Sequence, residues 1–282
     1  MRALVPLHVS GIWIPRLDED PLRSGSVGAG LNLTIYAKAE AVPGECGLLV
    51  NNSVVFRESS KRICVEAGVD IATRIEAPFN LGEGFGLSAA ALISHALLAF
   101  ARAKRPLTRA LQLAHELEVV QRTGLGDVIA EYTGGFVVRT VPGAPGHGYA
   151  YRVIPRTRVD LVVASTGFYE STSTMLSRMD SYTLELGERL LRDIVESEDL
   201  LVFFEAASTF TRRLFDYTRV DGVLRRARGV VGYYLKKAAL VVWVERDWRG
   251  EVYEALSRAG FKARYASISQ LGVMLVHTAE PP

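Results

Sequence analysis

The 282-residue sequence is poor in cysteine, and its charge is almost balanced. Cys46 and Cys64 are the two cysteines, and neither belongs to a CxxC or Cys/His cluster. We therefore expect neither a disulfide framework nor a zinc site, which fits a protein of the reducing cytoplasm. The formal net charge is +2, and the Arg residues are interspersed with Asp and Glu. This pattern argues against a dedicated nucleic-acid-binding protein.

The sequence also lacks a long uninterrupted apolar run. The longest stretch, about residues 89–100, contains Ser94 and His95 and is too short to span a bilayer. Residues 1–13 contain Pro6, a His and a Ser where a signal peptide has an apolar core. We expect neither a membrane segment nor a secretory signal.

What is present is the composition of an ordinary globular protein, with 49% hydrophobic and 23% charged residues. Apolar runs broken by Gly, Pro and Asn predict early strands at residues 2–6, 29–41, 48–55 and 63–65. Helical patterns follow at residues 87–104, 108–122 with Thr108 as the cap, 127–132, 172–217 and 251–259. Further strands are expected at residues 136–140, 159–164, 238–245, 261–266 and 272–277. The length and the change of pattern predict two lobes, residues 1–158 and an α+β lobe at residues 159–282.

A glycine-rich loop, GEGFGLSAA at residues 82–90, precedes the buried helix. Glycines let the backbone approach a ligand closely, and a helix N-terminus attracts anions, so phosphate is the natural ligand. The loop lacks the Gly-Lys-Ser/Thr ending of a Walker A motif, and the acidic residue of a Rossmann unit is missing. Taken alone, the glycines equally fit a flexible turn that clears room for packing.

Two carboxylates follow the loop. His115 and Glu118 share one edge of the second helix, whereas Glu116 falls on the opposite edge. If the shared edge faces the glycine loop, Glu118 can give Mg²⁺ a carboxylate oxygen, and otherwise it is a solvated surface charge. Asp127, in TGLGDV, follows a glycine turn and precedes a short helix. It either caps that helix or accepts the hydroxyl proton of an acceptor during phosphoryl transfer, and both roles are compatible.

These motifs resemble those of the GHMP kinase superfamily and, within it, the archaeal pantoate kinases. Pro78 followed by GEGFGLSAA is similar to the second GHMP motif, with Leu87 where most members have a Ser. Ala114-His115, Glu118, TGLGDV and Gly134-Gly135 match the pantoate kinase pattern, and PLHVSGIW and GSVGAGLNL resemble its earlier segments. The match is specific to about residue 140. Beyond residue 159 it is thin, because ARGVVGYYLKKAAL at residues 227–240 has only isolated glycines where the third, glycine-rich motif is expected.

The resemblance implies a two-lobed α+β fold, with a ribosomal protein S5 domain 2-like N-terminal lobe and a ferredoxin-like C-terminal lobe. It implies ATP and Mg²⁺ as cofactors, transfer to (R)-pantoate giving 4-phosphopantoate for archaeal coenzyme A synthesis, and a homodimer. It assigns catalysis to Asp127 and Mg²⁺ binding to Ser88 and Glu118. Nucleotide binding falls on Gly82, Gly84, Phe85, Gly86, Leu87, Ser88, Ala89 and Ala90. Pantoate binding falls on Ser26, His115, Arg139 and Thr172; a planar Arg fork suits a carboxylate.

Other functions remain open at this point. The same scaffold fits a kinase with another hydroxy-acid or alcohol acceptor, a ribofuranosylaminobenzoate-forming synthase, or a ligand sensor without turnover. The retained Ser88, Glu118 and Asp127 argue against the sensor. Lone His side chains are commonly structural, and Ser or Thr commonly serves a turn or cap, so His115, Ser26 and Thr172 each have a structural alternative.

Overall fold

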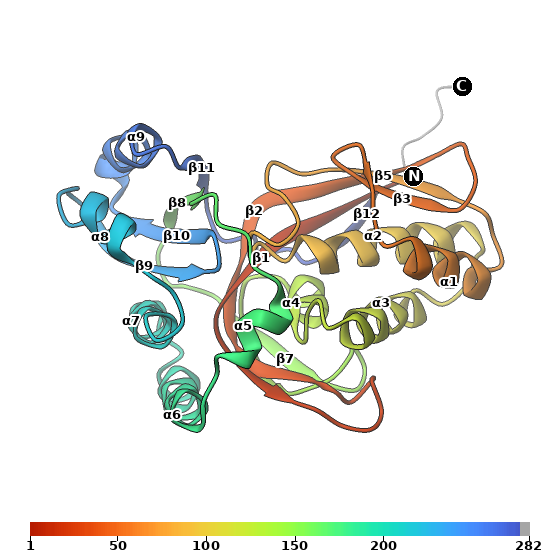
Figure 1. Ribbon diagram of the computed structural model, residues 1–282, viewed down its shortest axis with the longest axis horizontal. Coiled ribbons are helices and arrows are strands. Elements are labelled where there is room, and N and C mark those ends of the chain that lie inside the picture. Colours follow the sequence, from red (N-terminus) through yellow and green to blue (C-terminus); the bar gives the residue numbers. More distant parts are fainter. Residues whose placement is uncertain (277–282) are drawn as a thin grey trace.

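A computed structural model describes residues 1–276 of the chain, which form two β-sheets with helices packed on them (Figure 1). The first sheet has the order β12-β1-β2-β5-β3-β4, with β6 beside β2 and β7 beside β6. Its strands are β1 (Arg2–Arg16), β2 (Gly25–Val42), β3 (Gly47–Val50), β4 (Ser53–Val54), β5 (Ala72–Glu76), β6 (Phe136–Val141), β7 (Tyr149–Val153) and β12 (Met274–Val276). Its helices are α1 (Arg57–Ala67), α2 (Leu87–Arg102), α3 (Leu107–Gln121) and α4 (Asp127–Thr133).

The long strand β1 lies at the centre of the molecule. Its side chains are buried almost without alternation, because α2 packs on one side and helices of the second half pack on the other (Figure 1). Two register shifts against β2, between Pro6 and His8 and between Ser10 and Ile12, interrupt the ladder. Such bulges re-aim side chains, and here they flank the two buried polar residues of the strand, His8 and Ser10.

The second sheet is antiparallel and has the order β11-β8-β10-β9. Its strands are β8 (Asp160–Ser165), β9 (Val230–Lys236), β10 (Ala239–Val244) and β11 (Lys262–Ala266). Numbered along the chain, this is the 4-1-3-2 order of a ferredoxin-like sheet, so that prediction is confirmed. The helices are α5 (Thr172–Ser177), α6 (Ser181–Ser197), α7 (Leu200–Thr211), α8 (Thr218–Leu224), η1 (Arg246–Trp248) and α9 (Arg249–Arg258).

One hydrophobic core joins the two sheets. Phe203 and Phe210 of α7, Tyr234 of β9 and the apolar side chains of β1 and α2 belong to the same buried cluster. Trp13 of β1 meets Phe210 edge-on, with ring centroids 5.1 Å apart. Residues from α8 and α9 form a second cluster on the other face of the ferredoxin-like sheet. The second half of the chain is therefore packed directly on β1.

Some expectations from the sequence need correction. Residues 63–65 belong to α1 rather than a strand, because Ser59, Ser60, Ile63, Cys64 and Ala67 recur at helical spacing on its buried face. Strand β9 was not predicted, and the cap of α3 is Pro106 rather than Thr108. The predicted strand at 272–277 is β12 up to Val276, and His277 lies outside the described residues. Because β12 pairs with β1, the chain returns to the first sheet, and the lobe boundary at residue 158 stays a prediction.

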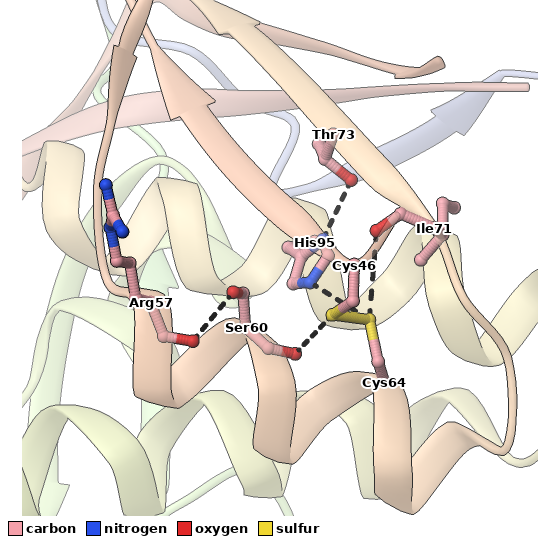
Figure 2. The surroundings of a disulfide bond; sticks show 7 residues. All are labelled: Cys46, Arg57, Ser60, Cys64, Ile71, Thr73 and His95. Carbon is pink, nitrogen blue, oxygen red and sulfur yellow. Dashed lines mark hydrogen bonds between the residues drawn. A yellow bond between two sulfur atoms is a disulfide. The ribbon is translucent and has the colours of Figure 1, made fainter. Parts of the chain in front are cut away.

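The expectation that the cysteines are unpaired is wrong. Cys46, in the turn after β2, and Cys64, on α1, form a disulfide with their Cα atoms 6.3 Å apart (Figure 2). His95 of α2 lies beside the disulfide, with Nε2 3.8 Å from Cys64 Sγ, and its Nδ1 is 2.8 Å from Thr73 Oγ1. The disulfide joins residues 18 apart in sequence, and no local sequence motif predicts this pairing.

Removing this disulfide is expected to lower the free energy of unfolding by about 3 kcal/mol, because the closed loop restricts the unfolded chain. Guanidinium unfolding with and without a phosphine reductant measures the effect. The double variant Cys46→Ala/Cys64→Ala serves as the control and should not respond to the reductant. An unfolding midpoint of the wild-type protein that the reductant leaves unchanged would contradict the structure at this point.

Across residues 1–276, no helix combines the length and the apolar character needed to cross a membrane.

Candidate active site

A pocket of about 290 Å³ lies where the two halves of the molecule meet. Four segments line it: the glycine loop before α2, the loop between α3 and α4, the segment leading into α5, and the turn between β9 and β10. Ser10, Trp13 and Ser26 add side chains from β1 and β2. The first sheet and the ferredoxin-like sheet therefore both contribute to one site.

The glycine loop needs its three glycines for both conformation and space. Gly82, Gly84 and Gly86 have φ values of 84°, 98° and 73°, which disfavour any other residue. A Cβ at Gly84 would lie 2.1 Å from the carbonyl oxygen of Lys236, and one at Gly86 would lie 2.4 Å from Glu131 Oε1. The loop ends at the N-terminus of the 16-residue helix α2, where unpaired N–H groups and the helix dipole attract an anion.

Most of the loop residues predicted to bind nucleotide line the pocket: Gly82, Gly84, Phe85, Gly86, Leu87 and Ser88. Ala89 and Ala90 do not line it and are fully buried in α2. The ring of Phe85 stacks on that of Phe79 with centroids 3.8 Å apart, which anchors the loop in the core. The assignment of the two alanines to nucleotide binding stays a prediction.

Ser88 and Glu118 meet across α2 and α3. The Ser88 hydroxyl donates to Glu118 Oε1 at 2.5 Å, and the Thr123 hydroxyl donates to the same atom at 2.8 Å. Glu118 Oε2 has no hydrogen-bond partner among residues 1–276, although the side chain is buried. A Cβ at Gly124 would lie 2.1 Å from this oxygen, so only glycine fits above it.

Burial raises the pKa of Glu118 to about 7, and the nearby negative charge of Asp127 adds to the effect. A buried carboxylate with one unsatisfied oxygen, beside a serine hydroxyl, is a set of hard oxygen donors. These residues fit a Mg²⁺ ion, which would compensate the charge that the protein itself leaves uncompensated.

Asp127 is the first residue of α4, and Gly126 rather than Asp127 takes the cap position. Its carboxylate accepts hydrogen bonds from the Lys236 ammonium at 3.3 and 3.4 Å and from the Ser10 hydroxyl at 3.5 Å. Burial on its own raises the pKa of Asp127, but the positive charges of Lys236, His8 and Arg139 and the hydrogen bond from Lys236 together outweigh it, and the pKa falls to about 2. The side chain is therefore ionised at neutral pH.

The four residues predicted to bind the acceptor fall into two groups. Ser26 and Thr172 line the pocket, whereas His115 and Arg139 do not. Arg139 is completely buried behind Ser26 and Gly126; its Nε donates to the Ser26 carbonyl at 3.3 Å. His115 lies 2.8 Å through Nε2 from the carbonyl oxygen of Ser24. Both side chains hold the start of β2 in place instead of facing the cavity.

Several residues at the site were not predicted from the sequence. Lys236 and Lys237 reach the pocket from the stretch that was judged only for its missing glycines. Ser10 was quoted only as part of a motif, yet it contacts the carboxylate of Asp127. Two adjacent lysines between apolar strand residues were the available signal. Behind the glycine loop, Glu131 is also buried, and within residues 1–276 neither of its oxygens has a partner. Burial, followed by the charge of Asp127, raises its pKa well above the usual range.

The chain is similar to known proteins both in sequence and in fold. No protein-family model matches the chain. Pantoate kinase from Thermococcus kodakarensis is 36% identical over 162 residues, which are 52% of this chain and 54% of that protein. Pantoate kinase from Methanocaldococcus jannaschii is 26% identical over 216 residues, 73% of this chain and 77% of that protein. The match therefore spans about half the length of the first relative and three quarters of the second.

Solved structures match over nearly the whole chain. A phosphotransferase related to the CoA biosynthesis pathway superposes with a TM-score of 0.77 at 24% identity, covering 97% of both chains. A putative homoserine kinase from Listeria monocytogenes gives a TM-score of 0.66 at 14% identity, covering 98% of this chain and 99% of that one. MDDEF in complex with MVAPP, AMPPCP and magnesium gives 0.69 at 13% identity, covering 98% of both chains. The chain thus has the two-lobed α+β fold of the GHMP kinases, and its relatives in sequence include archaeal pantoate kinases.

Proposed function

We propose that the protein is an ATP- and Mg²⁺-dependent kinase that converts (R)-pantoate to 4-phosphopantoate. The observation that carries the proposal is the convergence of three features in one pocket. These are the N-terminus of α2, Ser88 with its hydrogen-bond partner Glu118 buried behind the pocket lining, and the ionised Asp127 beside Lys236. Phosphoryl transfer needs a phosphate cradle, a metal site and a group that takes the acceptor proton, and each feature supplies one of them.

The nucleotide phosphates belong at the glycine loop. The residues from Gly84 to Ser88 line the pocket at the start of α2, so backbone N–H groups and the helix dipole face a phosphate there. Side chains at Gly84 and Gly86 would clash with the Lys236 carbonyl and with Glu131, so the loop keeps this path only with glycine. The chain therefore binds the phosphates largely through its backbone, without the lysine of a Walker A loop.

Ser88 and Glu118 would hold the metal ion through the Ser88 hydroxyl and the unpartnered Oε2 of Glu118. When bound, Mg²⁺ neutralises charge on the phosphates and aligns them for in-line transfer. Thr123 keeps Glu118 oriented by its hydrogen bond to Oε1.

Asp127 takes the proton of the acceptor hydroxyl. A carboxylate with a pKa of about 2 is a weak base, so it orients the hydroxyl and accepts the proton late, as the bond to phosphorus forms. Lys236 keeps Asp127 ionised and places a positive charge at the point of transfer. Ser10 fixes the carboxylate from β1.

A small hydroxy acid suits the rest of the pocket. Ser26 and Thr172 offer hydroxyls to a polar acceptor. Arg139 and His115 act on it indirectly, through the carbonyl groups of Ser26 and Ser24 that position the start of β2. We name pantoate as the acceptor because the relatives of the chain in sequence include pantoate kinases. The homodimer and the cytoplasmic location stay predictions.

Three other functions would use the same pocket differently. A kinase for another alcohol would keep Ser88, Glu118 and Asp127 and change only the acceptor side; a putative homoserine kinase has the same fold. A synthase acting on a phosphoribosyl donor would need no ATP. A sensor without turnover has no use for the Asp127–Lys236 pair, which requires the burial of two charges.

ADP release from Mg-ATP, measured with (R)-pantoate, pantothenate, mevalonate, homoserine or no acceptor, tests the proposal. We expect release that depends on (R)-pantoate and is abolished by a metal chelator. Release with another acceptor would keep the kinase and reject pantoate. The absence of release with every acceptor would reject the kinase.

A further inference from the structure

One cation of the pocket, Lys237, has no task in the reaction described above. It lies in the turn between β9 and β10, in the left-handed conformation with φ 57°, and it lines the pocket. Its side chain is buried, with the whole residue only 8% exposed. A lysine is rarely buried without a charged partner, so its surroundings indicate what it binds.

Lys237 is held by hydroxyls rather than by a carboxylate. Its ammonium donates to Thr172 Oγ1 at 2.9 Å, and the Thr172 hydroxyl donates to the carbonyl of Thr123 at 2.7 Å. No carboxylate among residues 1–276 forms an ion pair with it, whereas the neighbouring Lys236 pairs with Asp127. Burial lowers the pKa of Lys237 to about 8, and the adjacent charge of Lys236 acts in the same direction. A buried ammonium with donors left over favours an incoming anion.

The other cations near the pocket are less suited to a second anion. Arg139 was expected to bind a carboxylate, but it is buried behind Ser26 and does not line the cavity. Lys236 is engaged by Asp127, and Arg122 lines the pocket but is exposed to solvent. The phosphates have their own cradle at the glycine loop and the Ser88–Glu118 pair. Lys237 is the buried lining cation that remains for the anionic group of the acceptor.

We propose that Lys237 binds the carboxylate of the acceptor and makes the enzyme select a hydroxy acid over a neutral alcohol. The inference rests on the proposed function and deepens it. Thr172, which the resemblance assigns to acceptor binding, is hydrogen-bonded to this ammonium, so both belong to one subsite. The lysine gives the subsite charge, and the threonine fixes where the ammonium points.

Lys237→Met tests the charge with a side chain of similar length. A hydrogen bond to a charged group contributes about 1.5–3 kcal/mol, so the KM for (R)-pantoate should rise about 10- to 100-fold while the KM for ATP changes less than about 3-fold. The amide of pantoic acid should be a poor acceptor for the wild type, and acid and amide should become similar for Lys237→Met. Calorimetric titration of (R)-pantoate in the presence of Mg-ADP should show the same loss of affinity without turnover.

A second variant guards against a folding defect, because residue 237 has a left-handed backbone. Asn tolerates this conformation better than Met does, so Lys237→Asn should keep the wild-type unfolding midpoint and show the same change in KM. An increase in the KM for ATP alone would place a phosphate oxygen at Lys237 and overturn the inference. Unchanged KM values for both substrates, or an unchanged preference for acid over amide, would also overturn it. If the proposed function itself is wrong, the result is distinguishable, because the wild type would then neither bind nor phosphorylate (R)-pantoate.

Discussion

Asp127→Ala is expected to lower kcat by about 10²–10⁴-fold while leaving the affinity for nucleotide within a few fold. The carboxylate is hydrogen-bonded to Lys236 and Ser10 and, within residues 1–276, not to the glycine loop, so its loss removes the proton acceptor and leaves the backbone of the phosphate cradle in place. Steady-state ADP release gives kcat, and titration with Mg-ADP gives the nucleotide affinity.

Asp127→Asn is the matched variant, because it keeps the volume and the start of α4 but removes the charge. It should lose as much turnover as Asp127→Ala does. Both variants leave the Lys236 ammonium buried without its partner, so a lower unfolding midpoint is expected as well. A variant that keeps more than about a tenth of wild-type kcat would remove Asp127 from its assigned role.

Glu118→Gln is expected to abolish Mg²⁺-dependent turnover and yet to stabilise the metal-free protein. The pKa of Glu118 is about 7 in the folded protein and about 4.5 when the chain is unfolded. Between these values the folded state binds more protons, so the wild type loses stability as pH rises from about 4.5 to about 7. At pH 8 the variant should be more stable by about 3 kcal/mol, and the gain should vanish toward pH 4.5.

Chemical unfolding at pH 8 and pH 5 in the presence of a chelator measures this difference. Burial lowers the pKa of His95 to about 4, so over part of this pH range His95 changes the stability in the direction opposite to Glu118. Comparing variant and wild type at the same pH cancels the contribution of His95. Glu196→Gln, an exposed substitution on α6, is the control and should change neither stability nor activity. A Glu118→Gln protein that is less stable than the wild type at pH 8 would contradict the inference that the Glu118 carboxylate carries an uncompensated charge.

The glycine loop and Glu118 are predictable from sequence because what they require depends on residue type and local spacing. Three glycines before an apolar helix specify backbone conformation and close approach, and in the structure Gly84 and Gly86 lie close to a backbone oxygen and a side-chain oxygen of the protein itself. Helical spacing correctly placed Glu118 on the edge of α3 that faces Ser88. Strand alternation places Arg139 on the face of β6 opposite Phe136 and Val138.

Other parts depend on contacts that local patterns do not contain. Alternation gives the side of the strand on which Arg139 lies, but not that this side is covered by Gly126 and Ser26. Neighbouring strand residues point to opposite faces, so Lys236 and Lys237 would not be expected to share a pocket. The turn after β9 brings both into it, with Lys237 in the left-handed conformation.

The disulfide shows the same limit. Cys64 lies on a segment that the apolar run Ile63–Val65 suggested was a strand, and its partner Cys46 comes from the turn after β2. Pairing depends on how α1 packs against that turn, which the spacing of 18 residues does not reveal.

The most direct test of the proposed reaction is ³¹P NMR of the protein incubated with Mg-ATP and (R)-pantoate. We expect a phosphomonoester signal, coupled to the protons of a CH₂ group, that grows in equal amount with ADP and is absent without pantoate. Formation of inorganic phosphate alone, or no consumption of ATP, would contradict the assignment of this pocket to pantoate phosphorylation.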